Sequence, residues 1–320
     1  MINRMYVITL LSVLPFTACG SAQGGEKAEA PEVYFIREIT PQNMVRIYEA
    51  LERPATGKVA VKLSTGEPGG HNYLKPELIK DIVTKVGGTI VEECNTAYGG
   101  RARTQDHLKA AADHGFTAIA PVDIMDADGE VSLPVKGGKH LKENFVGSHY
   151  PRYDFTVVLS HFKGHAMGGF GGAVKNISIG IASSAGKAWI HSAGKTKNAA
   201  EMWSNLPAQD DFLESMAESA KSVADHCGDK ILYISVMNNL SVDCDCDAHP
   251  EEPKMGDIGI LASLDPVALD KACVDMVYAS PDPGKSHLIE RMESRHGIHT
   301  LEHAEAIGLG SQQYRLVELK

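Results

Sequence analysis

The sequence contains no excess of basic residues and no long block of one charge. Its 31 lysine and arginine residues are outnumbered by 41 aspartate and glutamate residues, which gives a formal net charge of -10. Proteins that bind nucleic acid need a basic surface to neutralise the phosphates. The composition therefore argues against nucleic acid as a partner, and the mixture of both signs along the chain predicts no charged tail.

The apolar run near the start of the chain is too short to cross a bilayer. It covers residues 5–16, follows one arginine and is followed by small residues directly before Cys19. This order is typical of an export signal, and small residues before a cysteine resemble the lipobox of bacterial lipoproteins. We therefore expect residues 1–19 to be a signal peptide and Cys19 to be lipidated. The alternative is ordinary cleavage a few residues later, near Ala22, which would release a soluble periplasmic protein.

Lipidation of Cys19 would place the protein in the cell envelope, anchored to the membrane by its lipid and facing the periplasm. Residues 20–32 are mostly small and polar, so they are predicted to form a tether. Residues 33–320 have the length of one large α/β domain. We therefore predict a single folded domain behind a flexible anchor.

Strand-like apolar runs alternate with amphipathic helical stretches through this domain. Strands are predicted at residues 59–63, 89–93, 154–160, 231–236 and 258–261, and helices at residues 76–86, 104–114, 211–226 and 266–278. This alternation predicts an α/β fold with a mainly parallel sheet and helices on both faces. Residues 180–210 have the weakest periodicity and are interpreted as a loop-rich insertion or cap.

The sequence has six cysteines but no C-x-x-C pair. Instead, Cys244 and Cys246 are separated by one aspartate, with His249 three residues further on. Two convergent thiolates chelate soft metals such as zinc or iron, so we predict a metal or redox site here. A local disulfide or two reduced cysteines in a loop are the alternatives. Cys94 follows a predicted strand and is expected at the same rim, so Cys94 or His249 is predicted as a further ligand of the metal.

A glycine-rich segment follows the strand predicted at residues 154–160. Gly171 and Gly172 allow close backbone approach, and backbone amides ahead of a helix attract anions. Lys163 and Lys175 add positive charge, and ligands of such sheets bind at the carboxyl ends of strands. Because the glycine spacing fits neither nucleotide fingerprint, we predict a small carboxylate or phosphate as the ligand. The alternative is a glycine-rich connection required for packing.

His165 is a candidate residue for both of these sites. It is predicted either to complete a metal site with Cys244 and Cys246 or to act as a general acid and base. Lys163 would polarise the substrate, and Asn176 would help to bind it.

Other polar residues have structural interpretations. Asp265 is predicted to cap the helix at residues 266–278, and Asp270 lies too far along that helix to form a carboxylate pair with it. Cys273 is expected in the core. His299 and His303 are one helical turn apart, but without a carboxylate motif they are interpreted as surface residues.

Several motifs occur in an order that resembles one family. They are Lys163-Gly164-His165 with Lys175-Asn176, Cys244-Asp245-Cys246, and residues 257–260, 265–270 and 306–310. Together they resemble the bacterial and archaeal "domain of unknown function 362" family over residues 33–320. The resemblance implies an iron-sulfur type of protein, because many members carry ferredoxin-like C-x-x-C-x-x-C runs before the Cys-Asp-Cys motif. Here that segment has only Cys227, so a pair of ferredoxin clusters is excluded by ligand count.

The sequence thus predicts an exported enzyme with one metal site that acts on a small anionic molecule. The metal would be iron, an iron-sulfur centre or zinc. The alternatives are a lipoprotein that binds a metal or an anion without catalysis, and a thiol-disulfide redox protein.

Overall fold

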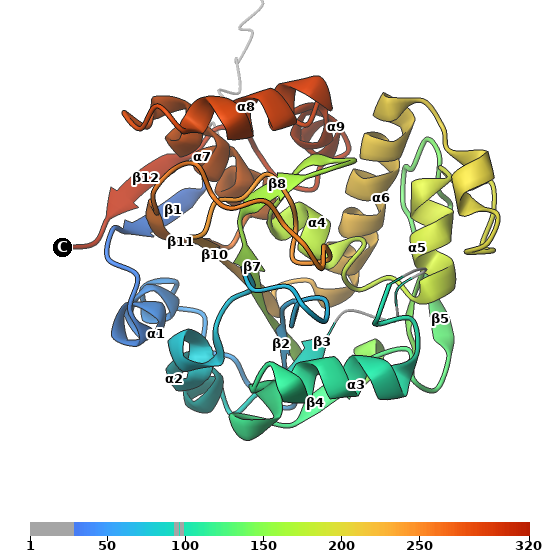
Figure 1. The fold of residues 1–320 in the computed structure, drawn as a ribbon, viewed down its shortest axis with the longest axis horizontal. Helices are drawn as coiled ribbons and strands as arrows, with labels where there is room; N and C mark the ends of the chain where they lie inside the picture. Colours follow the sequence, from blue (N-terminus) through green and yellow to red (C-terminus); the bar gives the residue numbers. More distant parts are fainter. Residues whose placement is uncertain (1–28, 93–95, 97–98) are drawn as a thin grey trace, which may run out of the picture.

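The computed structural model describes residues 29–92, 96 and 99–320. Its largest element is an eight-stranded sheet (Figure 1). The strands are β1 (Glu32–Ile36), β2 (Val59–Lys62), β3 (Thr89–Glu92), β4 (Val122–Ile124), β7 (Phe155–His161), β10 (Ile231–Met237), β11 (Gly259–Ser263) and β12 (Arg315–Glu318). Their order in the sheet is β12-β1-β11-β10-β7-β2-β3-β4.

The sheet is mainly parallel, as the sequence predicted. Strands β4, β3, β2, β7 and β10 form one parallel run, and β1 and β12 are also parallel to each other. Only β11 runs against its neighbours, β10 and β1. Two small antiparallel sheets lie outside it: β5 (Glu130–Pro134) with β6 (Glu143–Gly147), and β8 (Lys163–His165) with β9 (Gly169–Gly171).

Helices connect these strands. They are α1 (Pro41–Ala50), α2 (Pro76–Val86), α3 (Thr104–Asp113), α4 (Ala173–Ile177), α5 (Ser184–His191), α6 (Gln209–Cys227), α7 (Pro266–Ala279), α8 (Lys285–Ser294) and α9 (His299–Ala306). Three short 3₁₀ helices are η1 (Phe116–Ala118), η2 (Tyr150–Arg152) and η3 (Met202–Asn205).

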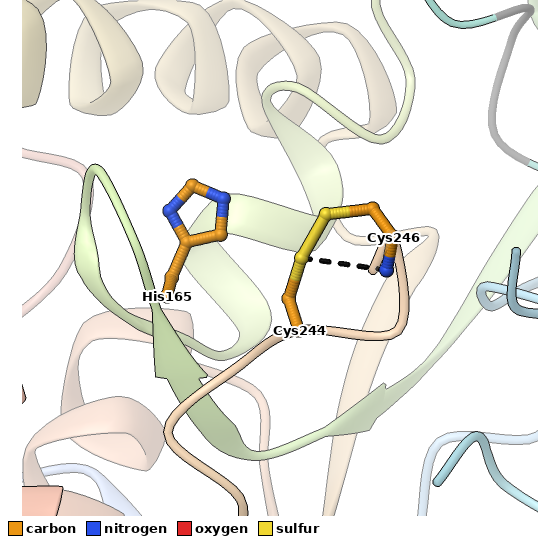
Figure 2. Close-up of side chains that lie close together, drawn as sticks. All are labelled: His165, Cys244 and Cys246. Carbon is orange, nitrogen blue, oxygen red and sulfur yellow. Dashed lines mark hydrogen bonds between the residues drawn. A yellow bond between two sulfur atoms is a disulfide. The ribbon is translucent and has the colours of Figure 1, made fainter. Parts of the chain in front are cut away.

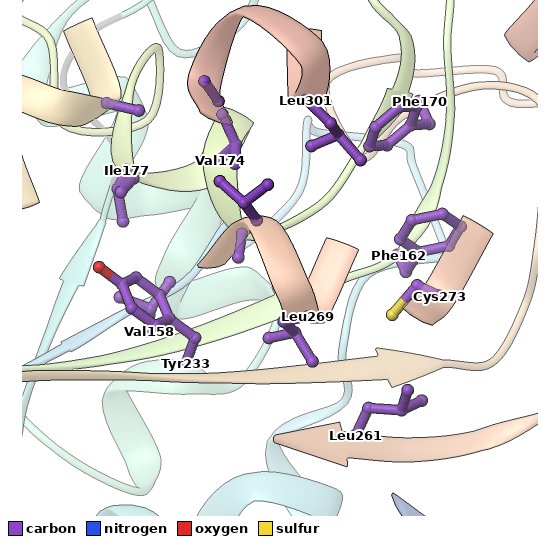
Figure 3. Close-up of a cluster of buried hydrophobic side chains, with 14 of the residues drawn as sticks. Val158, Phe162, Phe170, Val174, Ile177, Tyr233, Leu261, Leu269, Cys273 and Leu301 are labelled. Atoms are coloured by element: carbon purple, nitrogen blue, oxygen red, sulfur yellow. The ribbon is translucent and has the colours of Figure 1, made fainter. Parts of the chain in front are cut away.

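Helices cover both faces of the sheet, because side chains alternate along each strand. In β7, Val157 and Leu159 join a core with α1 and α2. Val158, between them, joins the core formed with α4, α6, α7 and α9 (Figure 3). A strand buried on both faces reads as a continuous apolar run, which is why the sequence predicted it so clearly.

The segment at residues 180–210 is more ordered than its weak periodicity suggested. It contains α5 and η3, and Ile190 and Met202 in these helices are buried. Ile190 packs in a small core with Phe212 and Leu213 at the start of α6. The segment is therefore a packed wall beside the sheet.

Two predictions about the helix at α7 are confirmed. The Asp265 carboxylate accepts hydrogen bonds from the backbone N–H groups of Val267 and Ala268, at 2.8 and 3.0 Å. Cys273 is fully buried in the core. Among the described residues, no helix is long and apolar enough to cross a membrane. The predicted signal peptide and Cys19 lie outside these residues.

Candidate functional site

The strand order of the sheet reverses between β2 and β7. From β2 the chain proceeds outward through β3 and β4, whereas β10 lies on the other side of β7. Lys62 ends β2 and His161 ends β7, and the two strands are parallel neighbours. Ligands of open α/β sheets bind at the carboxyl ends of strands at such a switch point. The topology therefore points to the surroundings of Lys62 and His161.

A cavity of about 80 Å³ lies at this place. We call it the lysine cavity, because Lys62, Lys163, Lys175 and Lys187 all line it. A single water needs roughly 10–15 Å³ of such space. The lysine cavity therefore has room for a chemical group of several non-hydrogen atoms.

A groove of about 810 Å³ shares part of the wall of the lysine cavity. The shared residues include His165, His191, Cys244 and Cys246. The two spaces therefore meet at the cysteine pair and two histidines.

Most residues that the sequence singled out line the lysine cavity. They are Lys163, His165, Gly171, Gly172, Lys175, Asn176, Cys244 and Cys246. His249 is exposed and lines neither space, so the structure does not bring it to the cysteine pair. Cys94 lies outside the described residues.

Lys62 and Lys187 are buried, and uncharged oxygens accept hydrogen bonds from both. The Lys62 Nζ donates to the carbonyl oxygen of Leu63 at 2.8 Å and to Asn176 Oδ1 at 2.9 Å. The Lys187 Nζ donates to the carbonyl oxygen of Ala182 at 2.8 Å. These contacts fix the positions of two ammonium groups in the lining of the lysine cavity.

Asn176 has a positioning role in this arrangement. Its side-chain N–H donates to the carbonyl oxygen of Leu159 and to Ser160 Oγ, both at 3.1 Å, while its oxygen accepts from Lys62. The amide thus joins α4 to the ends of β7 and β2. It holds Lys62 in place, in addition to lining the lysine cavity as the sequence predicted.

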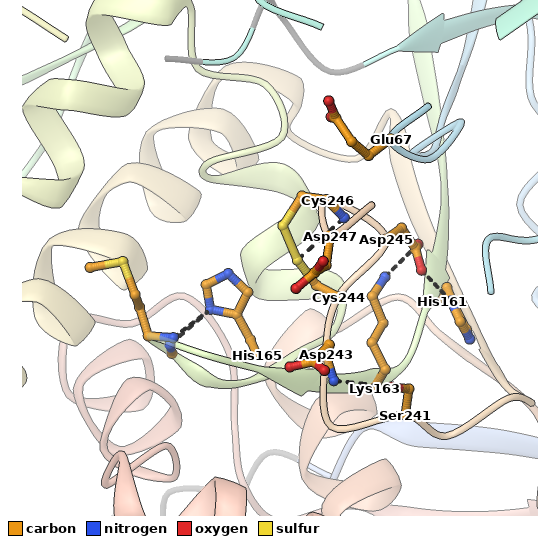
Figure 4. The surroundings of a disulfide bond; sticks show 12 residues. Glu67, His161, Lys163, His165, Ser241, Asp243, Cys244, Asp245, Cys246 and Asp247 are labelled. Atoms are coloured by element: carbon orange, nitrogen blue, oxygen red, sulfur yellow. Dashed lines mark hydrogen bonds and ion pairs between the residues drawn. A yellow bond between two sulfur atoms is a disulfide. The ribbon is translucent and has the colours of Figure 1, made fainter. Parts of the chain in front are cut away.

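Asp245, the middle residue of the Cys-Asp-Cys motif, lies between a lysine and a histidine. Its carboxylate is 2.7 Å from Lys163 Nζ and 2.8 Å from His161 Nδ1 (Figure 4). The other ring nitrogen of His161 donates to the carbonyl oxygen of Asn238 at 2.6 Å. Burial alone would raise the pKa of Asp245, but Lys163 and His161 outweigh it and hold that pKa well below its usual range. Asp245 is therefore a buried anion that fixes the loop between the two cysteines.

His165 is a buried neutral imidazole. Its Nδ1 accepts hydrogen bonds from the backbone N–H groups of Gly168 and Met167, at 2.8 and 3.3 Å. Burial, together with the nearby Lys175, lowers the pKa of His165 well below its usual value. A neutral ring whose Nδ1 accepts must carry its proton on Nε2. Figure 2 shows this second nitrogen on the side of the ring that faces the cysteine pair.

His191 has the opposite tautomer. Its Nδ1 donates to the carbonyl oxygen of Lys187 at 2.7 Å, and its ring stacks on Phe212 at 5.1 Å. Burial lowers the pKa of His191 to about 4. The Nε2 of this neutral ring therefore keeps its lone pair, so one histidine of the cavity can donate and the other can accept.

The two cysteines are joined by a disulfide bond. The sequence analysis kept this state open as an alternative. One ligand atom from each of His165, Cys244 and Cys246 lies within 4.8 Å of the other two, so the group could hold a metal ion once the sulfurs are separated. In the disulfide form neither sulfur is a thiolate, and thiolate is the form that binds metals.

The backbone amides after Gly172 are already occupied. The N–H groups of Ala173 and Val174 donate to the carboxylate of Asp270 at 2.7 and 2.9 Å. The sequence analysis expected such amides to attract an external anion. An aspartate of the protein itself takes that place, so the positive charge of the site comes from lysine side chains.

Sequence analysis missed Lys62, Lys187 and His191. The position of Lys62 at the end of a strand was a usable signal, because the ends of parallel strands meet at one edge. Lys187 and His191 are four residues apart and so share a face of α5. They were overlooked because residues 180–210 were interpreted as a loop-rich cap.

The family model described as "Domain of unknown function (DUF362)" matches residues 59–275. The chain belongs to the DUF362 family. This confirms the resemblance that the sequence motifs indicated. A comparison with curated proteins finds no match.

Two solved structures resemble this DUF362 member distantly. One is the lactate racemase apoprotein from Thermoanaerobacterium thermosaccharolyticum, with a TM-score of 0.44 and 13% identity, and the match covers 77% of this chain and 57% of that one. The other is a protein from Thermotoga maritima, with a TM-score of 0.38 and 10% identity, covering 85% of this chain and 60% of that one.

Proposed function

We propose that the protein is an enzyme that binds a small anion in the lysine cavity and acts on it beside Cys244 and Cys246. The observation that carries this proposal is the set of side chains that lines the cavity. Four lysines and both cysteines line the same space of about 80 Å³.

The charge of the lysine cavity favours an anionic ligand. Its acidic lining residues are already paired: Asp245 with Lys163, and Glu67 with Arg101 at 2.8 Å. Lys62 and Lys187 are buried, where charges interact more strongly than in water. A carboxylate or phosphate group would offset this positive charge.

The groove beside the lysine cavity is large enough to hold the rest of the substrate. An anionic group would occupy the lysine cavity, and the remainder would lie along the groove that shares the cysteine pair. His165 would donate a hydrogen bond from Nε2 to a substrate oxygen, and His191 Nε2 would accept one from a substrate hydroxyl or amine. Both rings are neutral, so these donor and acceptor roles are fixed near pH 7.

The reduced cysteine pair would hold a metal ion such as zinc or iron. Two thiolates one residue apart are suitable donors, and His165 is close enough to add a third. In its present tautomer, however, the Nε2 of His165 carries the proton, whereas metal-binding histidines donate from the other nitrogen to an acceptor. The metal proposal therefore rests on the two sulfurs. Such an ion would supply Lewis-acid or redox chemistry.

A second candidate function is dithiol-disulfide chemistry, which the sulfur-sulfur bond favours. The two thiols would close to the disulfide and give two electrons and two protons to an acceptor in the lysine cavity. Two external thiols would then reduce the disulfide again and leave joined as a disulfide of their own. This candidate needs no metal.

The anion proposal is tested by calorimetric titration with inorganic phosphate and with small carboxylates. We expect binding by the wild type, and binding at least about 10-fold weaker in Lys187→Met, since the change removes a buried charge. The matched control is Lys80→Met, on an exposed position of α2. The proposal fails if the wild type binds none of these anions, or if both variants bind equally well.

The chemistry of the cysteines is tested by elemental analysis and thiol counting on protein purified without oxygen. A stoichiometric metal that disappears in Cys244→Ser/Cys246→Ser would support the metal centre. Metal-free protein with two more thiols after reduction than before would support the redox function. An unchanged metal content in the double variant would exclude the cysteines as ligands.

Export and lipidation are proposed from the sequence. We expect the mature protein in the membrane fraction, released by Cys19→Ala. Mass spectrometry of the N-terminal peptide would identify the lipid or its absence.

A further inference from the structure

Helices α6 and α9 face each other with complementary residues. On α6, Glu214 and Glu218 are one turn apart, and on α9, His299 and His303 are one turn apart. The loop between β5 and β6 adds His140. We call these five residues with Asp211 the α6–α9 cluster. The sequence analysis interpreted the two α9 histidines as surface residues, but only 21% and 12% of their side-chain surfaces are exposed.

Glu214 is the centre of the α6–α9 cluster. Its Oε2 is 2.5 Å from His140 Nε2, and its Oε1 is 3.2 Å from His299 Nε2. Asp211 Oδ1 is 3.7 Å from His140 Nε2. One ligand atom from each of His140, Asp211 and Glu214 lies within 4.8 Å of the other two. His140 comes from the β5–β6 loop, whereas Asp211 and Glu214 both come from α6.

The orientation of His299 points to a cation. Its Nδ1 is 3.2 Å from Glu302 Oε2, and its Nε2 is 3.2 Å from Glu214 Oε1. A neutral imidazole has one N–H, so it can donate to only one of these carboxylates. The other contact then opposes two lone pairs unless a proton or a metal ion lies between them. A carboxylate that holds one imidazole nitrogen while the other binds a metal is a common arrangement in metal sites.

Glu218 has a different role in the cluster. Its carboxylate accepts hydrogen bonds from the backbone N–H groups of Lys139, His140 and Leu141, at 2.7, 3.1 and 2.7 Å. These bonds fix the loop that carries His140. Glu218 therefore positions His140, and its own carboxylate is occupied by these hydrogen bonds.

We propose that His140, Glu214 and His299, with Asp211, bind one zinc ion. Imidazole and carboxylate donors suit zinc, and the absence of a sulfur ligand from this set separates it from the cysteine pair. The ion would link the β5–β6 loop, α6 and α9. Because Phe212 on α6 supports His191, the zinc ion would stabilise a wall of the lysine cavity. The site is independent of the proposed function.

The test uses the full chain with Cys244→Ser and Cys246→Ser, so that zinc at the cysteine pair cannot contribute. After treatment with a chelator, zinc is added back, and bound zinc is measured by equilibrium dialysis with elemental analysis. We expect one zinc ion per chain and a higher melting temperature, since a ligand that binds only the folded state stabilises it. Wild-type protein with its disulfide closed is measured in parallel, in case the serine variant folds poorly. No zinc uptake by either protein overturns the proposal.

The ligands are tested with His140→Gln/His299→Gln in the same background. Glutamine retains an N–H that can donate to Glu214, so a purely hydrogen-bonded cluster would be largely preserved. We expect zinc affinity to fall at least about 100-fold, with little change in melting temperature when the chelator is present. His287→Gln, on α8, is the matched control and should bind zinc normally. Equal zinc binding by the double variant overturns the assignment, and His140→Gln alone decides if the double variant does not fold.

Discussion

The lysine cavity and the α6–α9 cluster both place histidines beside several charged groups, but the charges have opposite sign. In the lysine cavity, burial and lysines lower the pKa of His165, and burial lowers that of His191. In the cluster, burial opposes protonation of His299, but the adjacent Glu214 and Glu302 raise its pKa overall. The pKa of Glu214 falls to about 2 because Lys139, His140 and His299 outweigh the effect of burial.

The comparison shows that burial and neighbouring charges together decide the protonation state of a histidine. Neutral rings in the lysine cavity can donate or accept hydrogen bonds to a bound anion or its protonated groups. Rings among carboxylates attract a proton or a metal ion. The same residue type is therefore held in two different electrostatic environments in one protein, and substitutions can test that difference.

The largest effect is expected from Asp245→Asn, which removes the carboxylate charge that Lys163 and His161 contact. Leaving the buried Lys163 ammonium without this anionic partner should lower the free energy of unfolding by about 3–5 kcal/mol. Urea unfolding measures this loss. Because the lysine cavity becomes more positive, phosphate should at the same time bind more tightly to the folded protein.

The control for this prediction is Asp113→Asn, which breaks an exposed ion pair with Lys109. Exposed pairs contribute about 0–1 kcal/mol. A similarly small loss in Asp245→Asn would show that the buried ion pair contributes little to stability.

Acid should lower the free energy of unfolding through His191, which lines the lysine cavity. Its folded-state pKa of about 4 lies below the ordinary value of 6.5, so the unfolded chain binds more protons between these values. The stabilisation is therefore complete above pH 6.5 and is lost as the pH falls toward 4, by about 3 kcal/mol in total. Unfolding at pH 7 and pH 4.5 should show a smaller difference for His191→Phe, which keeps the stacking on Phe212. Equal pH dependence in both proteins would contradict the prediction.

Two adjacent glycines should respond differently to alanine. A Cβ on Gly172 would lie 2.3 Å from Asp270 Oδ1, the carboxylate that binds the start of α4. Gly172→Ala should therefore cost about 1–3 kcal/mol, the usual range for overpacking. A Cβ on Gly171 would meet only Lys175 Cδ at 3.3 Å, within a flexible side chain. Gly171→Ala should leave thermal stability nearly unchanged, and equal losses would contradict the geometry.

The smallest change in stability is expected from Lys175→Met. Lys175 is half-buried, so its loss should change the free energy of unfolding by less than about 1 kcal/mol, while phosphate affinity falls roughly 10-fold. The matched change in the other region is Lys139→Met, which removes a lysine of which 61% is exposed beside Glu214. Calorimetry should show weaker phosphate binding in the first variant alone.

Local patterns predicted the fold well. The strand expected at residues 154–160 is Phe155–His161, and the helix expected at residues 76–86 is Pro76–Val86. Both are decided by short-range periodicity, which a single sequence contains. The Cys-Asp-Cys motif and Lys163 were found for the same reason, since each stands out within a few residues.

Contacts over long sequence distances were not predictable in this way. His299 and Glu214 are 85 residues apart, so the local sequence pattern could not predict the carboxylate partner of the α9 histidines. Asp270 and the amide of Ala173 are 97 residues apart, and their hydrogen bond changed the interpretation of the glycine-rich segment. These groups meet only through packing of α6, α7 and α9 on one face of the sheet.

Asp245 has a consequence for how quickly the cysteine pair can change its state. Its carboxylate is held by Lys163 and His161, and its carbonyl oxygen accepts the backbone N–H of Glu67 at 2.8 Å. The backbone between the two sulfurs is thus immobilised from both sides. Reduction of the disulfide by external thiols would then be accompanied by rotation of the two cysteine side chains, with little reorganisation of the loop. Structures of the oxidised and reduced protein should superpose closely at residues 241–247.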